Sequence, residues 1–299
     1  MVKITCSILC FNYGRYLSQS IESCLNQLPG DYELEVFVID DGSTDDTPEI
    51  CARYASKIRV VRSANEGFGS SLTKAIQLAG GDYVCLLDAD DYFHPRKLSA
   101  IAPFLKQGAL FVRHGFQLVD PDDKLIKNEV QPGGATSGMC VNRAAALSLL
   151  PVSNERLFMP LDQPGKSVYL PEGLTYYRVH PGSMQRNRKA GEWQSRLAAV
   201  NRQSVARIDE LLRNPPNWVN SPAQLKKLRR ESRLITAFCE LEAALQLGER
   251  RRAFMLYGRY FQIAVSQGQL TMQIPKMFIR TLFCMSVYKI GRDTRPMCS

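Results

Sequence analysis

The 299-residue sequence lacks any run of the roughly 18 apolar residues that a membrane-spanning helix needs. The first residues, Met1 to Cys6, show neither the basic-then-apolar segment nor the small-residue cleavage site of a secretory leader. Histidine is scarce, with three residues, and no two of the nine cysteines have Cys-x-x-Cys spacing. These shortages argue against structural zinc sites and disulfide scaffolds, and they favour buried free thiols in a reducing compartment. We therefore expect a cytoplasmic protein.

Acidic residues are scarce in only one part of the chain. Residues 1–185 carry 17 Lys and Arg against 21 Asp and Glu, whereas residues 186–299 carry 21 against 8. This asymmetry predicts two domains, 1–185 and 186–299, of which the second faces an anionic partner. Nucleic acid is disfavoured as that partner, because the Arg and aromatic residues follow no known nucleic-acid-binding signature.

The second part of the sequence has the spacing of helices. We expect a helix over 192–213, a basic helix opened by Pro222, and a helical hairpin over 232–247 and 251–266. Residues 277–290 form an apolar run with isolated cations that is too short to span a bilayer. They either close the helical domain or lie peripherally in an anionic membrane surface, at the inner face of the membrane.

The first part of the sequence alternates between strand-like and helix-like segments. Each of four short apolar runs is followed by apolar residues at helical spacing, and the runs occupy 2–9, 35–39, 58–61 and 83–87. Four strand–helix units in succession are typical of a doubly wound sheet with helices on both faces.

Two of the predicted strands end in clustered acids. The second is followed by Asp40 and Asp41, and the fourth ends in Asp88, with Asp90 and Asp91 close behind. Because parallel strands bind ligands at their shared C-terminal edge, we expect these carboxylates to converge with the loop 10–12. Three acids in four residues repel one another, and a hard divalent cation that keeps positions open for substrate phosphates would hold them together. An acidic surface turn is the alternative.

The order and spacing of several motifs resemble those of bacterial family 2 glycosyltransferases, which have the GT-A fold. The likeness lies in residues 3–14, 36–45, 65–69 and 82–98, and more weakly in 136–151 and 174–183. It implies an α/β fold with a Rossmann-like, doubly wound mixed sheet, followed here by an all-α region. It also implies a metal-dependent, inverting hexosyltransferase that moves a sugar from a UDP-linked donor to a glycan or lipid-linked glycan hydroxyl.

The resemblance assigns metal roles at the fourth strand end. Asp90 matches the metal-binding acid of the family's Asp-x-Asp motif, with Mn²⁺ or Mg²⁺ as the cofactor. Asp88 would contact the ribose, and Asp91 would either support the metal ligands or cap the following helix. Arg178 and His180 resemble the family's Tyr-Arg-x-His segment, in which the Arg would bind the diphosphate and the His would bind the metal or the diphosphate.

The resemblance also assigns nucleotide contacts. Asp41 matches the acid that recognises the base, with Asp40 assisting, although both could instead cap the helix after Gly42. Phe11 stands where the family has a residue beside the base. Gly67 would let its loop approach the nucleotide closely, or it is a plain glycine at a helix start.

The catalytic base departs from the family's pattern. An inverting enzyme needs a carboxylate that takes the proton of the attacking hydroxyl. Asp162 is the candidate and Glu155 the reserve, but Pro164 and Gly165 after Asp162 argue against the usual helix. Asp162 lies only 16 residues before Arg178, a shorter segment than the resemblance implies, and this leaves open a catalytically impaired nucleotide-sugar-binding protein. A nucleotidyltransferase is disfavoured, because residues 10–15 supply only one Gly and one Arg for its phosphate loop.

Overall fold

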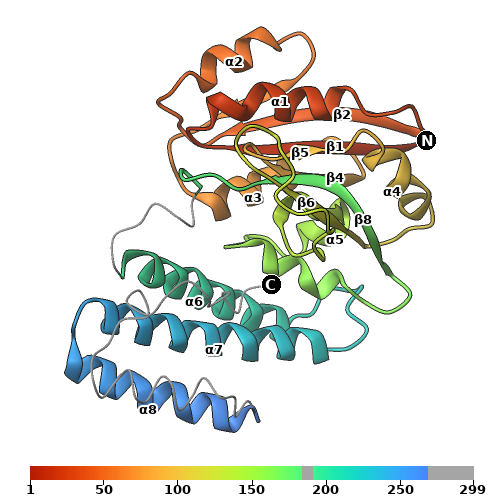
Figure 1. Cartoon of the computed structure of the whole chain (residues 1–299). Coiled ribbons are helices and arrows are strands. Elements are labelled where there is room, and N and C mark those ends of the chain that lie inside the picture. Colours follow the sequence, from red (N-terminus) through yellow and green to blue (C-terminus); the bar gives the residue numbers. More distant parts are fainter. Residues whose placement is uncertain (184–190, 269–299) are drawn as a thin grey trace. The chain divides into compact units, whose positions relative to one another are not determined.

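The computed structural model describes residues 1–183 and 191–268. The chain divides into two compact units, Met1–His180 and Pro181–Ser299 (Figure 1). The first is an α/β unit, and the described part of the second is helical. No helix in these two stretches is both long and apolar enough to cross a bilayer.

An eight-stranded mixed sheet forms the first unit, with the strand order β3-β2-β1-β4-β7-β6-β8-β5. Strands β1 to β4 pair in parallel, β7 runs antiparallel to β4 and β6, and β8 is parallel to β6. This arrangement confirms the predicted α/β class with a doubly wound mixed sheet. The strands are β1 (Val2–Cys10), β2 (Tyr32–Asp40), β3 (Arg59–Arg62), β4 (Tyr83–Asp88), β5 (Tyr92–Phe93), β6 (Phe111–Val119), β7 (Met139–Asn142) and β8 (Ser167–Arg178).

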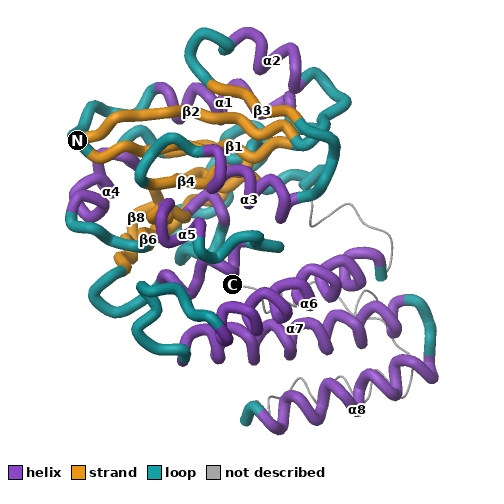
Figure 2. The backbone as a smooth tube through the Cα atoms, turned by 180° about the vertical axis from the view of Figure 1, so that it is seen from behind, coloured by secondary structure: helices purple, strands orange, loops and turns teal. Residues whose placement is uncertain are grey.

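Helices cover both faces of this sheet, which Figure 2 shows as one orange layer bordered by purple helices. Val36 and Val38 of β2 share a core with helices α1 and α4, while the alternate residues Phe37 and Ile39 are buried toward the other face, where α3 packs. Burial on both faces explains the near-continuous apolar runs of the strands. The helical segments are α1 (Gly14–Leu25), α2 (Thr47–Arg53), α3 (Phe68–Leu78), α4 (Lys97–Lys106), α5 (Arg143–Leu147) and two 3-10 helices, η1 (Thr136–Gly138) and η2 (Glu155–Leu161).

Three helices make up the described part of the second unit: α6 (Glu192–Arg213), α7 (Ala223–Gln246) and α8 (Arg250–Ser266). Helix α7 packs against both α6 and α8. The sequence predicted two helices where α7 is one continuous helix, because no breaker interrupts residues 223–246. The apolar run 277–290 lies outside the described residues.

Candidate functional site

The predicted acidic strand ends lie side by side at the C-terminal edge of the sheet. Asp40 of β2 is in register with Cys10 of β1, and Asp88 of β4 is in register with Leu9. The two carboxylate clusters therefore flank the end of β1. This is the edge at which open α/β sheets bind ligands.

Asp40 and Asp41 hold the loops that line this edge. Asp40 accepts a hydrogen bond from the Ser43 N–H (2.8 Å) and forms an ion pair with Arg62 (3.3 Å). The two carboxylate oxygens of Asp41 accept hydrogen bonds from the backbone N–H groups of Glu66 (2.9 Å) and Gly67 (2.8 Å). Neither acid caps α2, which starts at Thr47, so the capping alternative is wrong.

The loop after β1 is locked to the loop after β2. The backbone N–H of Asn12 donates to the Ser43 hydroxyl (2.9 Å), and the Asn12 side-chain oxygen accepts from the Thr44 N–H (2.7 Å). Phe11 is left 40% exposed next to this junction. On the far side of Asp41, Gly67 adopts a φ of 92°, which a residue with a side chain rarely adopts. Phe11, Asp41 and Gly67 thus come from three loops of the same edge.

The acidic turn after β4 is organised by Asp91. Its carboxylate accepts hydrogen bonds from the Ser137 hydroxyl (2.5 Å) and the Arg178 N–H (2.9 Å), and its carbonyl accepts from the Ser20 hydroxyl (2.8 Å). Helix α4 begins only at Lys97, so Asp91 does not cap it. Asp91 instead joins the turn to η1, β8 and α1, and its predicted role in supporting the metal ligands stays a prediction.

Carboxylate repulsion is concentrated at this turn. Burial, together with the charges of Asp90 and Glu155, raises the pKa of Asp88 well above its usual range. Burial and the charges of Asp90 and Asp88 likewise raise the pKa of Asp91, against the opposing hydrogen bonds of Ser137 and Arg178. A cation bound beside these groups would relieve the repulsion.

Asp90 and His180 are the pair best placed to hold such a cation. The His180 Nε2 atom lies 3.0 Å from the Asp90 carboxylate, and the imidazole rests against the rings of Tyr13 and Tyr16. Adjacent ligands of an octahedral cation with bonds of about 2.1 Å are about 3 Å apart, so the pair fits one coordination sphere. Within residues 1–183 and 191–268, no group of three His, Cys, Asp or Glu side chains is placed to hold a metal. The site therefore fits a cation that takes its remaining ligands from water and substrate phosphates.

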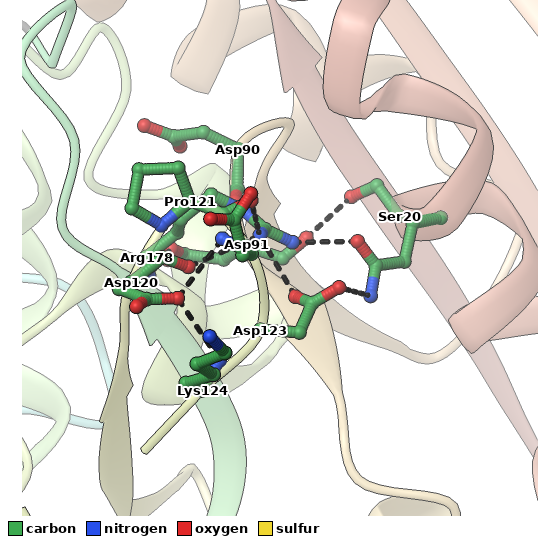
Figure 3. Close-up of polar contacts among 10 residues, drawn as sticks. Ser20, Asp90, Asp91, Asp120, Pro121, Asp123, Lys124 and Arg178 are labelled. Carbon is green, nitrogen blue, oxygen red and sulfur yellow. Dashed lines mark hydrogen bonds and ion pairs between the residues drawn. The ribbon is translucent and has the colours of Figure 1, made fainter. Parts of the chain in front are cut away.

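Arg178 lies beneath this pair and is engaged by the protein itself. Its side chain is 1% exposed. Figure 3 shows the guanidinium among Asp90, Asp120 and Asp123, while the Asp90 carboxylate points away from it. The guanidinium nitrogens contact the carbonyl oxygens of Asp90 (2.9 Å), Asp120 (3.4 Å) and Pro121 (3.2 Å), the Gln19 side-chain oxygen (2.5 Å) and the Asp123 carboxylate (2.7 Å).

These contacts tie Arg178 into the protein, and its predicted contact with the diphosphate stays a prediction. The guanidinium has five N–H donors, and only one of them, on Nη2, has no partner among these contacts. The side chain thereby fixes the backbone of Asp90 relative to α1 and to the loop 120–123.

Asp162, the first candidate base, was expected near the acidic turn, but it lies beside Arg113. Its carboxylate forms an ion pair with Arg113 and accepts a hydrogen bond from the Ser167 hydroxyl (2.7 Å). Arg113 is near the start of β6 and Ser167 opens the parallel strand β8, whereas Val119 and Arg178 end these strands beside the acidic turn. About 20 Å of strand separate Arg113 from Val119. Asp162 therefore lies toward the opposite end of these strands.

Glu155 is the carboxylate that lies near the acidic turn. Its charge raises the pKa of Asp88. Burial raises the pKa of Glu155 itself, while its own N–H and Arg156 lower it. It is the first residue of η2, which places it before the Pro-Gly segment that made Asp162 doubtful.

Sequence reasoning did not single out three other residues around the turn. The pKa of Tyr177 is raised by burial and by the charges of Asp91, Asp88 and Asp90, so its phenol faces the turn. Ser137 and Lys97 are fully buried and join the same hydrogen-bond network. Tyr177 could have been found from its place beside Arg178, but a Lys at a helix start gives no signal of burial.

Comparison with known proteins gives a consistent picture. Residues 5–140 match the sequence model of Glycosyl transferase family 2. An uncharacterized glycosyltransferase of Nostoc sp. is 30% identical over 212 residues, which are 60% of this chain and 65% of that protein. A chondroitin synthase of Escherichia coli is 41% identical over 88 residues, which are 28% of this chain and 12% of that protein. The matches thus span less than two thirds of the length of these relatives.

Solved structures share the fold at low sequence identity. S. aureus TarS 1–349 in complex with UDP-GlcNAc superposes with a TM-score of 0.65 at 17% identity, covering 94% of this chain and 88% of that one. The mannosyltransferase PcManGT from Pyrobaculum calidifontis, in complex with GDP-Man and Mn²⁺, gives a TM-score of 0.51 at 15% identity, covering 94% and 86%. At these identities the similarity establishes the fold, which is GT-A.

The role of Arg178 can be tested through stability. Replacing it by Met leaves buried carbonyl groups without donors and Asp123 without its partner, so the free energy of unfolding should fall by about 3 kcal/mol or more. The matched variant Asp123→Asn keeps the guanidinium and should lose about 1 kcal/mol or less, because Asp123 is half-exposed. Urea unfolding followed by circular dichroism measures both. Equal losses of stability in the two variants would contradict this role of Arg178, since they would mean that only its ion pair with Asp123 stabilises the fold.

Proposed function

Because the chain belongs to glycosyl transferase family 2, we propose that it is a metal-dependent, inverting glycosyltransferase acting on a nucleotide-sugar donor. UDP is the expected nucleotide, and the acceptor is the hydroxyl of a glycan or of a lipid-linked glycan. The observation that carries the proposal is the Asp90–His180 pair, 3.0 Å apart at the edge where the nucleotide loops converge. The UDP-GlcNAc and GDP-Man complexes of the structural neighbours support a nucleotide-sugar donor.

Each side of the edge has a part in donor binding. Phe11 would contact the base, and Asp41, whose oxygens keep lone pairs beyond those used by the 66–67 backbone, would accept its N–H. Asp40 and Gly67 hold the two loops in place, and Asp88 would face the ribose. Asp90 and His180 would hold Mn²⁺ or Mg²⁺, which when bound stabilises the negative charge that develops on the departing diphosphate.

Glu155 replaces Asp162 as the proposed base. In the transfer, the acceptor oxygen attacks the anomeric carbon, the bond from that carbon to the diphosphate breaks, and the acceptor proton goes to a carboxylate. Glu155 lies on the acidic turn's side of the sheet, whereas Asp162 is held by Arg113. The raised pKa of Glu155 also suits a base that works near neutral pH.

Metal-dependent UDP binding tests the donor site. Isothermal titration of UDP should show tighter binding with Mn²⁺ than without it, and Asp90→Ala should abolish the difference because it removes the carboxylate ligand. Asp122→Ala, which removes an exposed acid from the loop 120–123, should leave the difference unchanged. If the affinity for UDP changes neither with Mn²⁺ nor with the Asp90→Ala substitution, the metal-diphosphate site is ruled out.

The base is tested by comparing two conservative substitutions. Glu155→Gln should lower kcat for sugar transfer by about 10²–10⁴-fold, whereas Asp162→Asn should have a much smaller effect. Because a base must be unprotonated, the rate should fall as pH decreases through the raised pKa of Glu155. Release of UDP from a panel of nucleotide sugars, with and without acceptor, is the measurement. If the wild-type protein binds UDP but cleaves no nucleotide sugar of the panel, the alternative of a catalytically impaired nucleotide-sugar-binding protein is supported instead.

The second unit supports an additional proposal, contact with an anionic membrane surface. Helix α8 exposes Phe254 (58%), Met255 (70%), Phe261 (42%) and Val265 (43%). Phe254, Phe261 and Val265 are spaced i, i+7 and i+11, so they share one face. Four arginines lie on the same helix, at 250, 251, 252 and 259. Exposed apolar residues beside cations are typical of helices that lie in anionic lipid interfaces.

Vesicle sedimentation of the full chain tests this contact. Binding should be stronger to vesicles that contain phosphatidylglycerol than to pure phosphatidylcholine, and it should weaken with salt. Combining Phe254→Gln with Phe261→Gln should reduce it, whereas Leu125→Gln, at an exposed position of the first unit, should not. Equal binding to the two kinds of vesicle, or none, would exclude the proposal.

A further inference from the structure

A buried lysine stands behind the acidic turn. Lys97, the first residue of α4, is fully buried, and its ammonium group donates to the Ser137 carbonyl (2.9 Å) and lies 3.3 Å from the centroid of the Phe93 ring. No carboxylate of the described residues lies within ion-pair distance of it. The titratable groups that interact with its charge are the thiols of Cys6, Cys24, Cys85 and Cys140 and the imidazole of His114.

Such a position is costly for an ammonium group. Taking a charge out of water without a carboxylate partner is strongly unfavourable. Burial accordingly lowers the pKa of Lys97, although the neighbouring thiols counteract this. A methionine would fill similar space in this core without the desolvation penalty. Packing alone therefore does not account for a lysine at this position.

Ser137 connects this charge to the turn. Its carbonyl accepts from Lys97 and from the Thr175 hydroxyl (2.8 Å). Its own hydroxyl donates to the Asp91 carboxylate (2.5 Å) and accepts the backbone N–H of Asp88 (3.1 Å). Asp90 lies between the two residues that Ser137 holds. One buried serine therefore fixes both ends of the segment that carries the proposed metal ligand.

We propose that Lys97 and Ser137 are positioning residues of the metal-binding turn. Ser137 sets the direction of Asp90 toward His180 by holding Asp88 and Asp91. Lys97 anchors Ser137 from inside the protein through the Ser137 carbonyl, without touching the ligand. The inference rests on the proposed function, since it takes Asp90 to be a metal ligand.

The proposal is tested with Ser137→Ala, Lys97→Met and their combination. The full chain is titrated with Mn²⁺ in the presence of UDP, and with UDP in the absence of metal. Each single variant should weaken Mn²⁺ binding about 10-fold or more, because it frees the turn that carries Asp90. UDP binding without metal should stay within about twofold, because the base contacts proposed for Phe11 and Asp41 do not involve Ser137 or Lys97. The double variant should lose less than the product of the two single effects, since both act through Ser137.

Ser7→Ala is the matched control. Ser7, on β1, is also a fully buried serine, and its hydroxyl has no hydrogen-bond partner within the described part of the chain. It should leave both titrations unchanged. If Lys97→Met fails to fold by circular dichroism, Ser137→Ala alone decides, because it removes one hydroxyl and keeps the lysine contact.

The outcomes separate this inference from the proposed function. A wild-type protein that binds Mn²⁺ with UDP, together with folded variants whose Mn²⁺ affinity stays within about twofold, would overturn the positioning role alone. A wild-type protein whose UDP binding does not respond to Mn²⁺ would overturn the proposed function and this inference with it. Equal losses in the metal-dependent and metal-free titrations would mean general damage to the fold, which also overturns the positioning role.

Discussion

The hydrogen bonds to the Asp91 carboxylate are the interaction on which the site depends. They join η1, through Ser137, to the end of β8, through the Arg178 N–H. The backbone of the same residue receives the Ser20 hydroxyl from α1 and donates its N–H to the Asp88 carbonyl. Three segments that are distant in sequence, η1, β8 and α1, therefore meet at one buried aspartate. Charge-assisted hydrogen bonds of this kind are stronger than neutral ones, and losing any partner would leave a buried charge poorly solvated.

The charges around Asp91 divide into an inner and an outer set. The inner cations, Arg178 and Lys97, are buried and bound to protein oxygens. The outer group is the Asp90 carboxylate, which faces His180. The inner cations bind carbonyl oxygens of the turn and of η1, whereas the Asp90 carboxylate remains available to a ligand. Burial and mutual repulsion still raise the pKa values of Asp88 and Asp91, so these contacts order the turn without removing the repulsion.

The sequence predicted the sheet and its acidic edge well, for physical reasons. Apolar runs such as 83–87 are long enough to be read as buried strands, and the residues after them must lie at the shared edge. The assignment of Arg178 could not be made from sequence, because the motif specifies its position on β8 but not the five oxygens that surround its guanidinium. The surroundings of Asp162 were hidden for a similar reason, since nothing local reveals an ion pair with Arg113, which lies 49 residues earlier. The role of Lys97 depends on packing alone.

The Asp90–His180 contact also bears on how the protein folds. The two residues are 90 positions apart, and His180 follows β8, the last strand to enter the sheet. The nucleotide loops, by contrast, come from the first 67 residues. Contacts between distant parts of a chain form late, because the loop between them must be closed first. During synthesis, the growing chain would thus present the proposed base-binding loops well before it could bring His180 to Asp90, which requires β8 to pair with β6.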